Sequence, residues 1–331
     1  MTAYVIASGS ALPDRIVTND ELAPQLGLAS EQIVKSSGIK ERRWAEPGSP
    51  TSKLAAEALS KAIEESAITA DKIDYLILGT MTPDRFVPGI APSVQKEVGL
   101  RDIPCLDIRA ACCNTLYGLQ IAKSLITSKA VKNVALAFAE IQSAFLDVSS
   151  RSGTTSMLFG DGAAALIVSE EKTSNALEII DVRIATDGSY VDDLGIRCPG
   201  SQFGREQSAE NAADFLPRMK GQSVILNAAR KLVEASLGVL QRNGLTATDV
   251  SWIVPHQANA NLLTQVMKSL HINPQSDILI SILEKTGNTS SASMGLALDS
   301  LRRSNRIRSG DLLLLPAFGA GFMWGAALCR A

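Results

Sequence analysis

The stretch AITADKIDYLILGT at residues 67–80 returns in altered form as GLTATDVSWIVPHQ at residues 244–257. Each copy follows an amphipathic segment, LAAEALSKAIEES before the first and ILNAARKLVEASLGVL before the second. The copies are 177 residues apart, about half of a chain of 331 residues. Self-similarity at such an interval predicts two copies of one plan, each a helix followed by a strand.

The segments that follow also share a pattern of strand, turn and helix. IPCLDI at residues 103–108 is a short apolar run, after which two alanines turn the chain and apolar residues recur at helical spacing. DILISIL at residues 277–283 leads through Gly287 to a second helix in the same way. The interval of 177 residues places Cys112 opposite residue 289, next to Asn288.

Two glycine-led stretches, FGDGAAALIVS and FGAGFMWGAALCR, resemble each other as turns entering buried strands. Strands that alternate with helices predict a mainly parallel α/β sheet, with the reactive groups gathered at the carboxyl ends of the strands.

Composition narrows the class of protein. A hydrophobic content of 46% over 331 residues predicts one large globular unit or two packed halves. The formal charge of −2 gives no basic field, so nucleic acid is not expected as a partner. No apolar run is long enough to span a membrane, and the start lacks a leader pattern, so we expect a cytoplasmic protein. Five irregularly spaced cysteines predict neither a disulfide framework nor a metal site.

Adjacent cysteines, Cys112 and Cys113, stand where the first of the two turns meets its helix. Unpaired N–H groups and the positive end of the helix dipole favour a thiolate at that place. The two sulfurs point about 100° apart around a helix, so only one of them can face a given site. The position suits Cys112 as a nucleophile, and the alternative is that both cysteines are small buried hydrophobes.

The chain has two histidines. His256 follows a strand and opens a polar segment, where it serves either as a catalytic group or as a helix cap, whereas His271 is expected at a solvated helix end. Asn288 follows Gly287 before a Ser/Thr cluster, where a capping role is the alternative to catalysis. The turn FGAGF at residues 318–322 is either a plain tight turn or a source of backbone N–H groups for an oxyanion.

Taken together, six stretches resemble the 3-oxoacyl-[acyl-carrier-protein] synthase III enzymes of the thiolase superfamily, in family order and over nearly the whole length. They are GIKERRW, DIRAACCNTLYGLQIA, FGDGAAALIV, WIVPHQAN, GNTSSAS and FGAGFMWGAAL. The resemblance implies a thiolase-like five-layer αβαβα fold of two duplicated halves, residues 1–172 with the nucleophile and residues 173–331 with the histidine and the asparagine. It also implies a homodimer and no cofactor besides the thioester substrates.

By the same resemblance, Cys112, His256 and Asn288 form the catalytic set. Cys112 attacks an acyl thioester, with its own N–H and one from residues 319–321 stabilising the oxyanion. A malonyl thioester, carried by CoA or by an acyl-carrier protein, then loses CO₂, and the enolate accepts hydrogen bonds from His256 and Asn288. Phe318 borders the malonyl carboxylate and favours its loss as neutral CO₂.

Several positions depart from the family pattern. The turn after Phe318 is Gly319-Ala320-Gly321, so the second oxyanion N–H is expected from a residue with a side chain. The expected CoA contacts are Gln32, in place of an adenine-stacking tryptophan, and Arg151. The expected pocket residues are Asn114 and Val87, the latter in place of an aromatic residue across the dimer. The carrier-docking positions after the histidine are Asn261, Ser269 and Lys268.

Other functions remain open from the sequence alone. Cysteine, histidine and asparagine also occur in this order in papain-like hydrolases, but there the cysteine lies near the mature N-terminus of a secreted chain. Nearer alternatives are a specialised relative with an aromatic or unusual primer, as the similarity to quinolone-signal synthases indicates, and acyl transfer to oxygen or nitrogen without decarboxylation. A non-catalytic partner subunit is a further possibility, against which the intact Cys112, His256 and Asn288 argue.

Overall fold

The computed structural model describes residues 2–150, 153–202, 204, 206–208 and 210–331. Over these residues the backbone forms a nine-stranded mixed sheet in the order β11-β12-β13-β8-β1-β7-β6-β4-β5. The strands are β1 (Tyr4–Ala11), β4 (Tyr75–Gly79), β5 (Cys105–Ile108), β6 (Asn133–Glu140), β7 (Gly162–Ser169), β8 (Leu177–Thr186), β11 (Trp252–Ile253), β12 (Leu312–Gly319) and β13 (Met323–Arg330).

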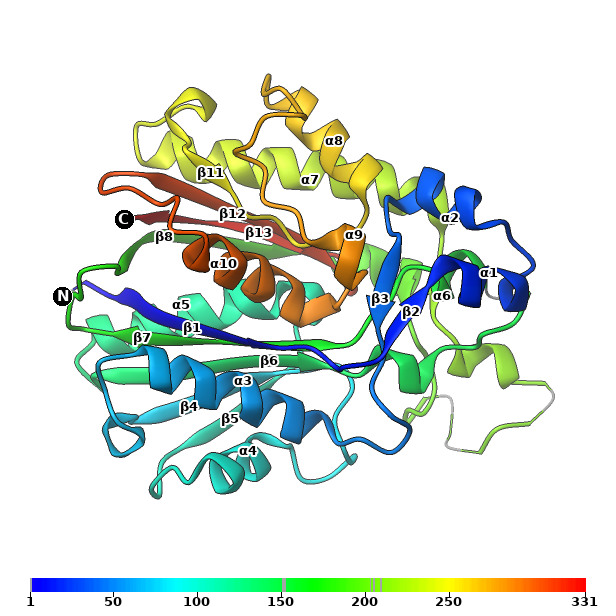
Figure 1. Ribbon diagram of the computed structural model, residues 1–331, viewed down its shortest axis with the longest axis horizontal. Helices are drawn as coiled ribbons and strands as arrows, with labels where there is room; N and C mark the ends of the chain where they lie inside the picture. The colour runs from blue at the N-terminus through cyan, green and yellow to red at the C-terminus, as the bar shows by residue number, and fades with distance from the viewer. Residues whose placement is uncertain (1, 151–152, 203, 205, 209) are drawn as a thin grey trace.

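Helices lie on both sides of the sheet and between its two parts (Figure 1). In that view α3 lies over the lower strands and α4 below them, α5 and α10 lie in the middle, and α7 and α8 lie above the upper strands. The order of layers is therefore αβαβα, as predicted. These helices are α3 (Thr51–Glu65), α4 (Ala91–Val98), α5 (Asn114–Thr127), α7 (Gly221–Arg242), α8 (Ala260–Ser269) and α10 (Ser293–Arg303).

The duplication is visible in the pairing of the strands. In the order β1-β7-β6-β4 the three successive pairs are antiparallel, antiparallel and parallel, and the order β8-β13-β12-β11 repeats this. The two parts join where β1 pairs with β8 at Tyr4 and Val5. β7 and β13, which follow the two similar glycine turns, hold equivalent places. The expected division at residues 172 and 173 falls in the connection between β7 and β8.

The expectation of a mainly parallel sheet is wrong. β7 runs antiparallel to both of its neighbours, and β13 does the same. The reason is local for β13, because the three residues between Gly319 and Met323 return the chain directly beside β12, and a connection that short permits only an antiparallel pair.

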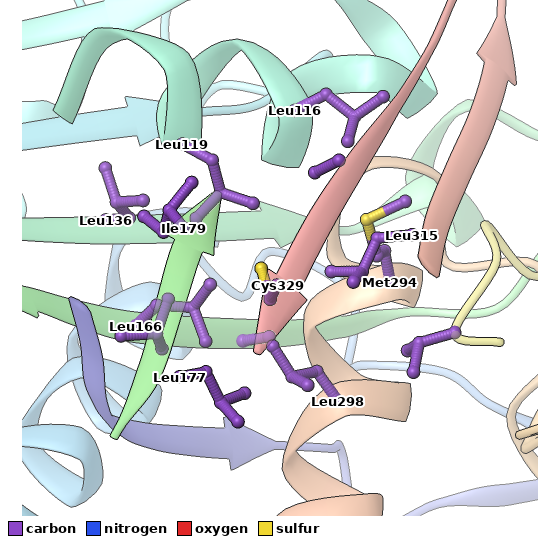
Figure 2. Close-up of a cluster of buried hydrophobic side chains, with 14 of the residues drawn as sticks. Leu116, Leu119, Leu136, Leu166, Leu177, Ile179, Met294, Leu298, Leu315 and Cys329 are labelled. Carbon is purple, nitrogen blue, oxygen red and sulfur yellow. The ribbon is translucent and has the colours of Figure 1, made fainter. Parts of the chain in front are cut away.

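The central helices pack their apolar sides between the two parts of the sheet (Figure 2). Leu116 and Leu119 come from α5, and Met294 and Leu298 come from α10. All four are at most 1% exposed. Each such side chain contributes about 1.5–3 kcal/mol when fully buried. This core fixes the N-terminal ends of α5 and α10 relative to each other.

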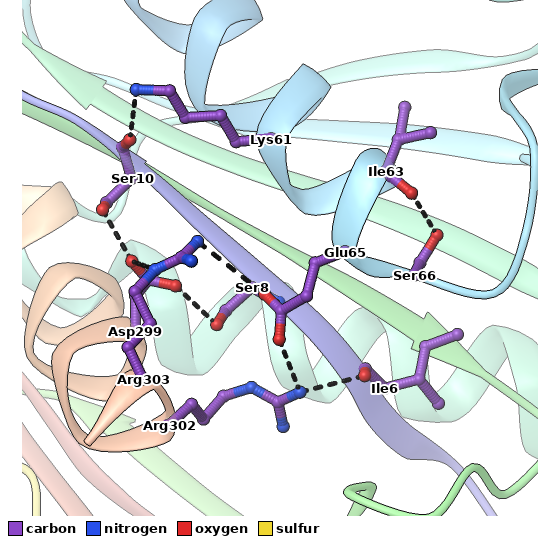
Figure 3. A network of polar contacts seen from close by, with 10 residues as sticks. All are labelled: Ile6, Ser8, Ser10, Lys61, Ile63, Glu65, Ser66, Asp299, Arg302 and Arg303. Atoms are coloured by element: carbon purple, nitrogen blue, oxygen red, sulfur yellow. Dashed lines mark hydrogen bonds and ion pairs between the residues drawn. The ribbon is translucent and has the colours of Figure 1, made fainter. Parts of the chain in front are cut away.

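A polar network holds α10 against β1 and α3 (Figure 3). The buried Asp299 accepts hydrogen bonds from Ser8 Oγ at 2.7 Å, Ser10 Oγ at 2.6 Å and Arg303 Nε at 2.9 Å. Arg302 reaches Glu65 of α3 at 3.3 Å. A carboxylate buried in this way remains stable because each oxygen has donors.

Shorter elements lie at the edges of the fold, and α1, α2 and the antiparallel pair β2-β3 surround a small separate core that includes Leu22, Ile33 and Trp44. These elements are β2 (Ile16–Thr18), α1 (Asn19–Leu26), α2 (Ser30–Ser37), β3 (Glu41–Arg43), α6 (Gly153–Ser156), β9 (Leu194–Gly195), β10 (Arg218–Met219) and α9 (Leu283–Thr286). Among the residues that the structure describes, no helix combines the length and the apolar character needed to cross a membrane.

Candidate active site

The first turn of the site, the 3₁₀ segment η2 (Ala111–Cys113), links β5 to α5. Ala111 has a left-handed φ of 47°, which turns the chain sharply before the helix begins at Asn114. Cys113 is fully buried, and its Sγ contacts Met323 O at 3.3 Å. Cys112 has intermediate exposure and faces the opposite turn. Of the two adjacent sulfurs, only that of Cys112 is in a position to meet a ligand.

A second turn of the same shape, η7 (Ser290–Ala292), precedes α10. Its first residue, Ser290, also has a φ of 47°. Because Ala111 and Ser290 are 179 residues apart, the structural counterpart of Cys112 is Ser291 and not residue 289. The interval of 177 residues inferred from the strands is therefore wrong at the turns, since the second turn begins two residues later when counted from Trp252 than the first does when counted from Tyr75.

The two turns meet at Cys112, whose Sγ lies 3.6 Å from Ser290 Oγ. Asn288 lies directly before this second turn, and its Oδ1 accepts a hydrogen bond from Ser290 N–H at 2.8 Å. The backbone of Asn288 also pairs with Leu158 O and Gly160 N–H, at 2.8 and 3.1 Å. With Oδ1 occupied, the Nδ2 end of the amide is the donor available to a ligand.

His256 enters the site from the end of β11. Its backbone N–H donates to Pro316 O at 2.9 Å, and its Nδ1 lies 2.6 Å from Ser293 Oγ. Gln257 N–H donates to the same hydroxyl at 3.2 Å. We assign the hydroxyl hydrogen to Nδ1 and the ring proton to Nε2. Burial lowers the pKa of His256 to about 4. The ring is thus a neutral donor, and the capping role belongs to Asn259, which caps α8.

The turn between β12 and β13 approaches Cys112 from a third side. A Cβ on Gly319 would lie 2.9 Å from Cys112 N, so only glycine permits this approach. The backbone N–H groups of Cys112 and Ala320 both stabilise the ionised form of the sulfur. Two backbone donors at one reactive atom form the arrangement that stabilises an oxyanion in acyl transfer.

The expectation that Cys112 is a thiolate at rest is wrong. Burial raises the pKa of Cys112 to about 11, and this effect outweighs the lowering by the Ser290 hydroxyl and by the two backbone N–H groups. The negative charge of Glu140 raises it further. The helix itself starts only at Asn114, so its dipole acts from beyond the turn.

Comparison with known proteins adds the family. The models for 3-oxoacyl-[acyl-carrier-protein] synthase III and for its C-terminal region match residues 106–188 and 240–331. A beta-ketoacyl-[acyl-carrier-protein] synthase III of Chlamydia caviae is 38% identical over 328 residues, which cover 99% of this chain and 96% of the relative. The chain belongs to the 3-oxoacyl-[acyl-carrier-protein] synthase III family.

Solved structures of this family have the same fold. The 3-oxoacyl-[acyl-carrier-protein] synthase III of Aquifex aeolicus superposes with a TM-score of 0.90 at 32% identity, covering 99% of this chain and 100% of that one. The priming beta-ketosynthase from the R1128 polyketide biosynthetic pathway superposes with a TM-score of 0.88 at 30% identity, covering 99% and 95%. The synthase III chain is therefore a condensing acyltransferase with the predicted thiolase-like fold, and it needs no cofactor beyond its acyl thioester substrates.

Other residues predicted for this synthase III site lie around the turns. Phe318 is 6% exposed and meets Phe322 edge to face at 5.0 Å, and Phe322 stacks on Tyr190 at 4.5 Å. Asn114 is fully buried, and its Oδ1 accepts from Ala110 N–H at 2.7 Å across the first turn. Asn114 therefore supports the turn that carries the nucleophile. Gly321, with a φ of 78°, continues the third turn.

The predicted substrate contacts at the periphery are placed differently. Val87 is 74% exposed on a single chain, so its place in an acyl pocket depends on a second copy. The side chain of Gln32 accepts from Ala29 N–H at 2.8 Å and serves in the N-terminal cap of α2. Asn261 donates to Ser36 O at 3.0 Å and joins α8 to α2. Arg151 lies outside the described residues. Lys268 and Ser269 are exposed, and His271 is exposed as expected.

Three residues of this synthase III site were not predicted from the sequence: Ser290, Ser293 and Glu140. The first two lie in the quoted GNTSSAS stretch, where the Ser/Thr cluster was the available signal. Within the described residues, no three side chains of His, Cys, Asp or Glu gather as a metal would require.

Proposed function

We propose that this synthase catalyses a decarboxylative Claisen condensation through an acyl-Cys112 intermediate. The observation that carries the proposal is the meeting of three turns at one sulfur, with the Cys112 and Ala320 N–H groups beside it and Ser290 Oγ at 3.6 Å. This is a constellation for acyl transfer, because a nucleophile and its oxyanion donors occupy the same point.

In the first stage the Cys112 sulfur attacks the carbonyl carbon of an acyl thioester. The new S–C bond replaces the bond to the departing thiol, and the proton of Cys112 ends on that departing sulfur. A neutral thiol with a pKa of about 11 is a weak nucleophile at rest, so attack and proton loss go together. The backbone N–H groups of Cys112 and Ala320 hold the oxyanion.

In the second stage a malonyl thioester loses CO₂, and its carbon attacks the acyl group to release Cys112. His256 Nε2–H and Asn288 Nδ2–H donate to the enolate oxygen. Both donors are neutral. They suit an enolate, because its oxygen carries the negative charge that remains when CO₂ leaves. The buried Phe318 keeps the departing carboxylate in an apolar environment, which favours the neutral product.

We propose an acyl-CoA as the primer and a malonyl thioester, on CoA or on an acyl-carrier protein, as the extender. The cytoplasm is the proposed compartment, because no disulfide joins the cysteines of the described residues and structural disulfides mark oxidising compartments. The two units of the chain are taken as residues 1–172 and 173–331, each contributing one of the two matching turns.

A homodimer through β5 fits the edge of the sheet. Leu76 and Thr80 of the neighbouring segment donate to Pro104 O and Ile108 O, so the backbone groups of Cys105 and Asp107 face the open side. An open strand edge is a template for a second copy. The exposed Val87 belongs to the same half and would reach the partner's site from there.

The test is mass measurement of the intact protein after incubation with a panel of acyl-CoAs. We expect a stable mass gain that is lost in Cys112→Ser and kept in the matched control Cys113→Ser. Addition of malonyl-CoA or malonyl carrier protein should discharge the adduct with release of CO₂. Discharge to an oxygen or nitrogen nucleophile without CO₂ would overturn condensation, and an adduct that survives Cys112→Ser would overturn the nucleophile.

A further inference from the structure

Glu140, at the end of β6, is a fully buried carboxylate that the proposed chemistry does not use. The hydrogen bonds described for it come from neutral donors. Met81 N–H lies 3.2 and 3.1 Å from its two oxygens, Thr82 Oγ1 lies at 2.9 Å and Gln142 Nε2 at 3.2 Å. Burying a carboxylate without a nearby cation costs free energy. Other interactions in the fold must therefore offset that cost.

The carboxylate joins two segments that are far apart in the sequence. Met81 and Thr82 follow β4 directly, and Thr82 O in turn accepts from Thr51 Oγ1 of α3 at 2.6 Å. From the other side, the hydroxyl and the backbone N–H of Ser291 stabilise the charged form of Glu140. Ser291 belongs to η7, the second of the two turns at the nucleophile.

The second turn, η7, needs contacts that hold it in its conformation. Ser290 has a φ of 47°, and a left-handed conformation at a residue with a side chain persists only where its surroundings enforce it. The one hydroxyl hydrogen of Ser291 is shared with Gly79 O, which lies 3.3 Å from Ser291 Oγ, so the end of β4 belongs to the same cluster. Ser290 directly precedes Ser291 in the chain, and its hydroxyl lies 3.6 Å from Cys112 Sγ.

We propose that Glu140 is a positioning residue for the nucleophile: it fastens Ser291 to the segment after β4 and so keeps the Ser290 hydroxyl against the Cys112 sulfur. The inference rests on the proposed function for the identity of the nucleophile. It concerns only how the sulfur is held, because Glu140 acts through Ser290 and Ser291 and not on the substrate.

The negative charge of Glu140 and its proposed positioning role have opposite effects on the pKa of Cys112. The Ser290 hydroxyl lowers the pKa of Cys112, whereas the negative charge of Glu140 raises it. Burial in turn raises the pKa of Glu140 to about 7. Near neutral pH the carboxyl group therefore binds a proton, and its charge then no longer raises the pKa of Cys112. The other carboxylates near these segments point elsewhere: Asp84 accepts from Ser52 N–H, and Asp161 accepts from Ala45 and Ser143.

The test measures the rate at which iodoacetamide alkylates Cys112, assigned by loss of that label in Cys112→Ser. Since the reactive species is the thiolate, the rate at a fixed pH reports how well the sulfur is stabilised. Loss of the hydrogen bond from Ser290 should slow alkylation about 10-fold in Ser290→Ala. Glu140→Ala should produce a similar slowing, and the double variant should be no slower than Ser290→Ala alone, because both changes remove one contact.

Conservative and control variants make the result specific. Glu140→Gln keeps one acceptor oxygen and removes the charge, so it should restore the rate to within about threefold of the unsubstituted protein or exceed it. Ser291→Ala cuts the same link from the other side and replaces Glu140→Ala in the cycle if that variant does not fold by circular dichroism. Asp299→Asn changes another buried carboxylate, bound to Ser8, Ser10 and Arg303, and should leave the rate unchanged.

The inference is overturned if Glu140→Ala, or Ser291→Ala in its place, alkylates as fast as the unsubstituted protein. It is also overturned if the effects of Glu140→Ala and Ser290→Ala multiply, or if Glu140→Gln is as slow as Glu140→Ala. Alkylation needs no acyl substrate. A failure of the proposed condensation would therefore appear in the acyl-CoA experiment and leave this measurement interpretable.

Discussion

Ala111 and Ser290 share a left-handed φ of 47° and begin the two turns that meet at the Cys112 sulfur. Each stands at the end of a strand-to-helix connection, one in each half of a duplicated fold. The duplication therefore supplies two strained turns that meet at Cys112 and Ser290. Only the first turn bears a thiol, whereas the second bears the hydroxyl that stabilises it.

Strain at Ala111 predicts an unusual response to glycine. In general, replacing alanine by glycine costs stability, but a left-handed residue gains from it. We expect Ala111→Gly to be about 1 kcal/mol more stable than the matched control Ala110→Gly, whose φ is −110° at the same 5% exposure. Urea unfolding of the two variants gives the difference directly. Equal losses in both would contradict strain at Ala111.

Close approach of the third turn predicts that Gly319→Ala disables acylation. The added Cβ would lie 2.9 Å from Cys112 N, which is backbone and cannot rotate away. The turn must shift, and with it the Ala320 N–H, so formation of the acyl-enzyme should slow at least about 100-fold. At Gly321 the added Cβ would meet only the flexible end of Met323 at 3.2 Å. Gly321→Ala, the control, should therefore lose stability but retain faster acylation than Gly319→Ala in a stopped-flow assay.

Local patterns were enough to predict the duplication and the helix-strand order, whereas the catalytic roles of Cys112, His256 and Asn288 stay predictions. They were not enough for the strand directions, because the antiparallel pairing of β13 with β12 follows from a three-residue connection, whereas β7 pairs with β6 across residues 141–161, which carry no local signal of direction. The thiolate prediction was wrong for a similar reason. The helix start is visible in the sequence, but the burial that raises the pKa of Cys112 to about 11 appears only once both halves close around it.

The contacts of Ser290 and Ser293 could not be predicted either. Cys112 and Ser290 are 178 residues apart, and the interval of 177 residues taken from the strands pointed to residue 289. Two additional residues before the second turn moved the match to Ser291. A sequence repeat locates corresponding elements, whereas a hydrogen bond requires the position of each atom within them.

The open edge of β5 predicts that a proline at residue 105 abolishes the homodimer. The N–H of Cys105 faces away from β4, so its removal leaves the pairing within the chain intact. Sedimentation velocity should show a monomer for Cys105→Pro and a dimer for the control Cys105→Ala. A dimeric Cys105→Pro that retains full activity would place the interface elsewhere.

The buried ring of His256 predicts a pH-dependent contribution to stability. Its pKa is about 4 in the folded chain against its usual value of 6.5, so between these values only the unfolded chain binds the proton. The contribution is complete above pH 6.5 and is lost as the pH falls towards 4. At pH 5 the free energy of unfolding should be lower by about 2 kcal/mol for this reason, and His256→Asn should not show this loss.

Chemical unfolding at pH 7 and pH 5 measures this difference. Glu140 contributes with the opposite sign, because its pKa is raised from 4.5 to about 7 and the folded chain takes up that proton first. Its contribution favours folding at low pH and is lost as the pH rises to about 7. The comparison that decides is therefore between the unsubstituted protein and His256→Asn at each pH. An equal fall in both would mean that His256 is charged in the folded chain.

The hydrogen bond between Ser293 and His256 predicts that the two stages can be separated. Ser293 Oγ lies 2.6 Å from His256 Nδ1 and fixes the proton on Nε2, where the enolate is expected. Ser293→Ala should therefore slow discharge of the acyl-enzyme by the malonyl thioester about 10-fold and leave acylation of Cys112 unchanged. Rapid-quench measurement of each stage tests this, and Ser293→Thr, which keeps the hydroxyl, should recover most of the discharge rate. Slower acylation with normal discharge would instead assign His256 to the first stage, as the group that takes the proton from Cys112.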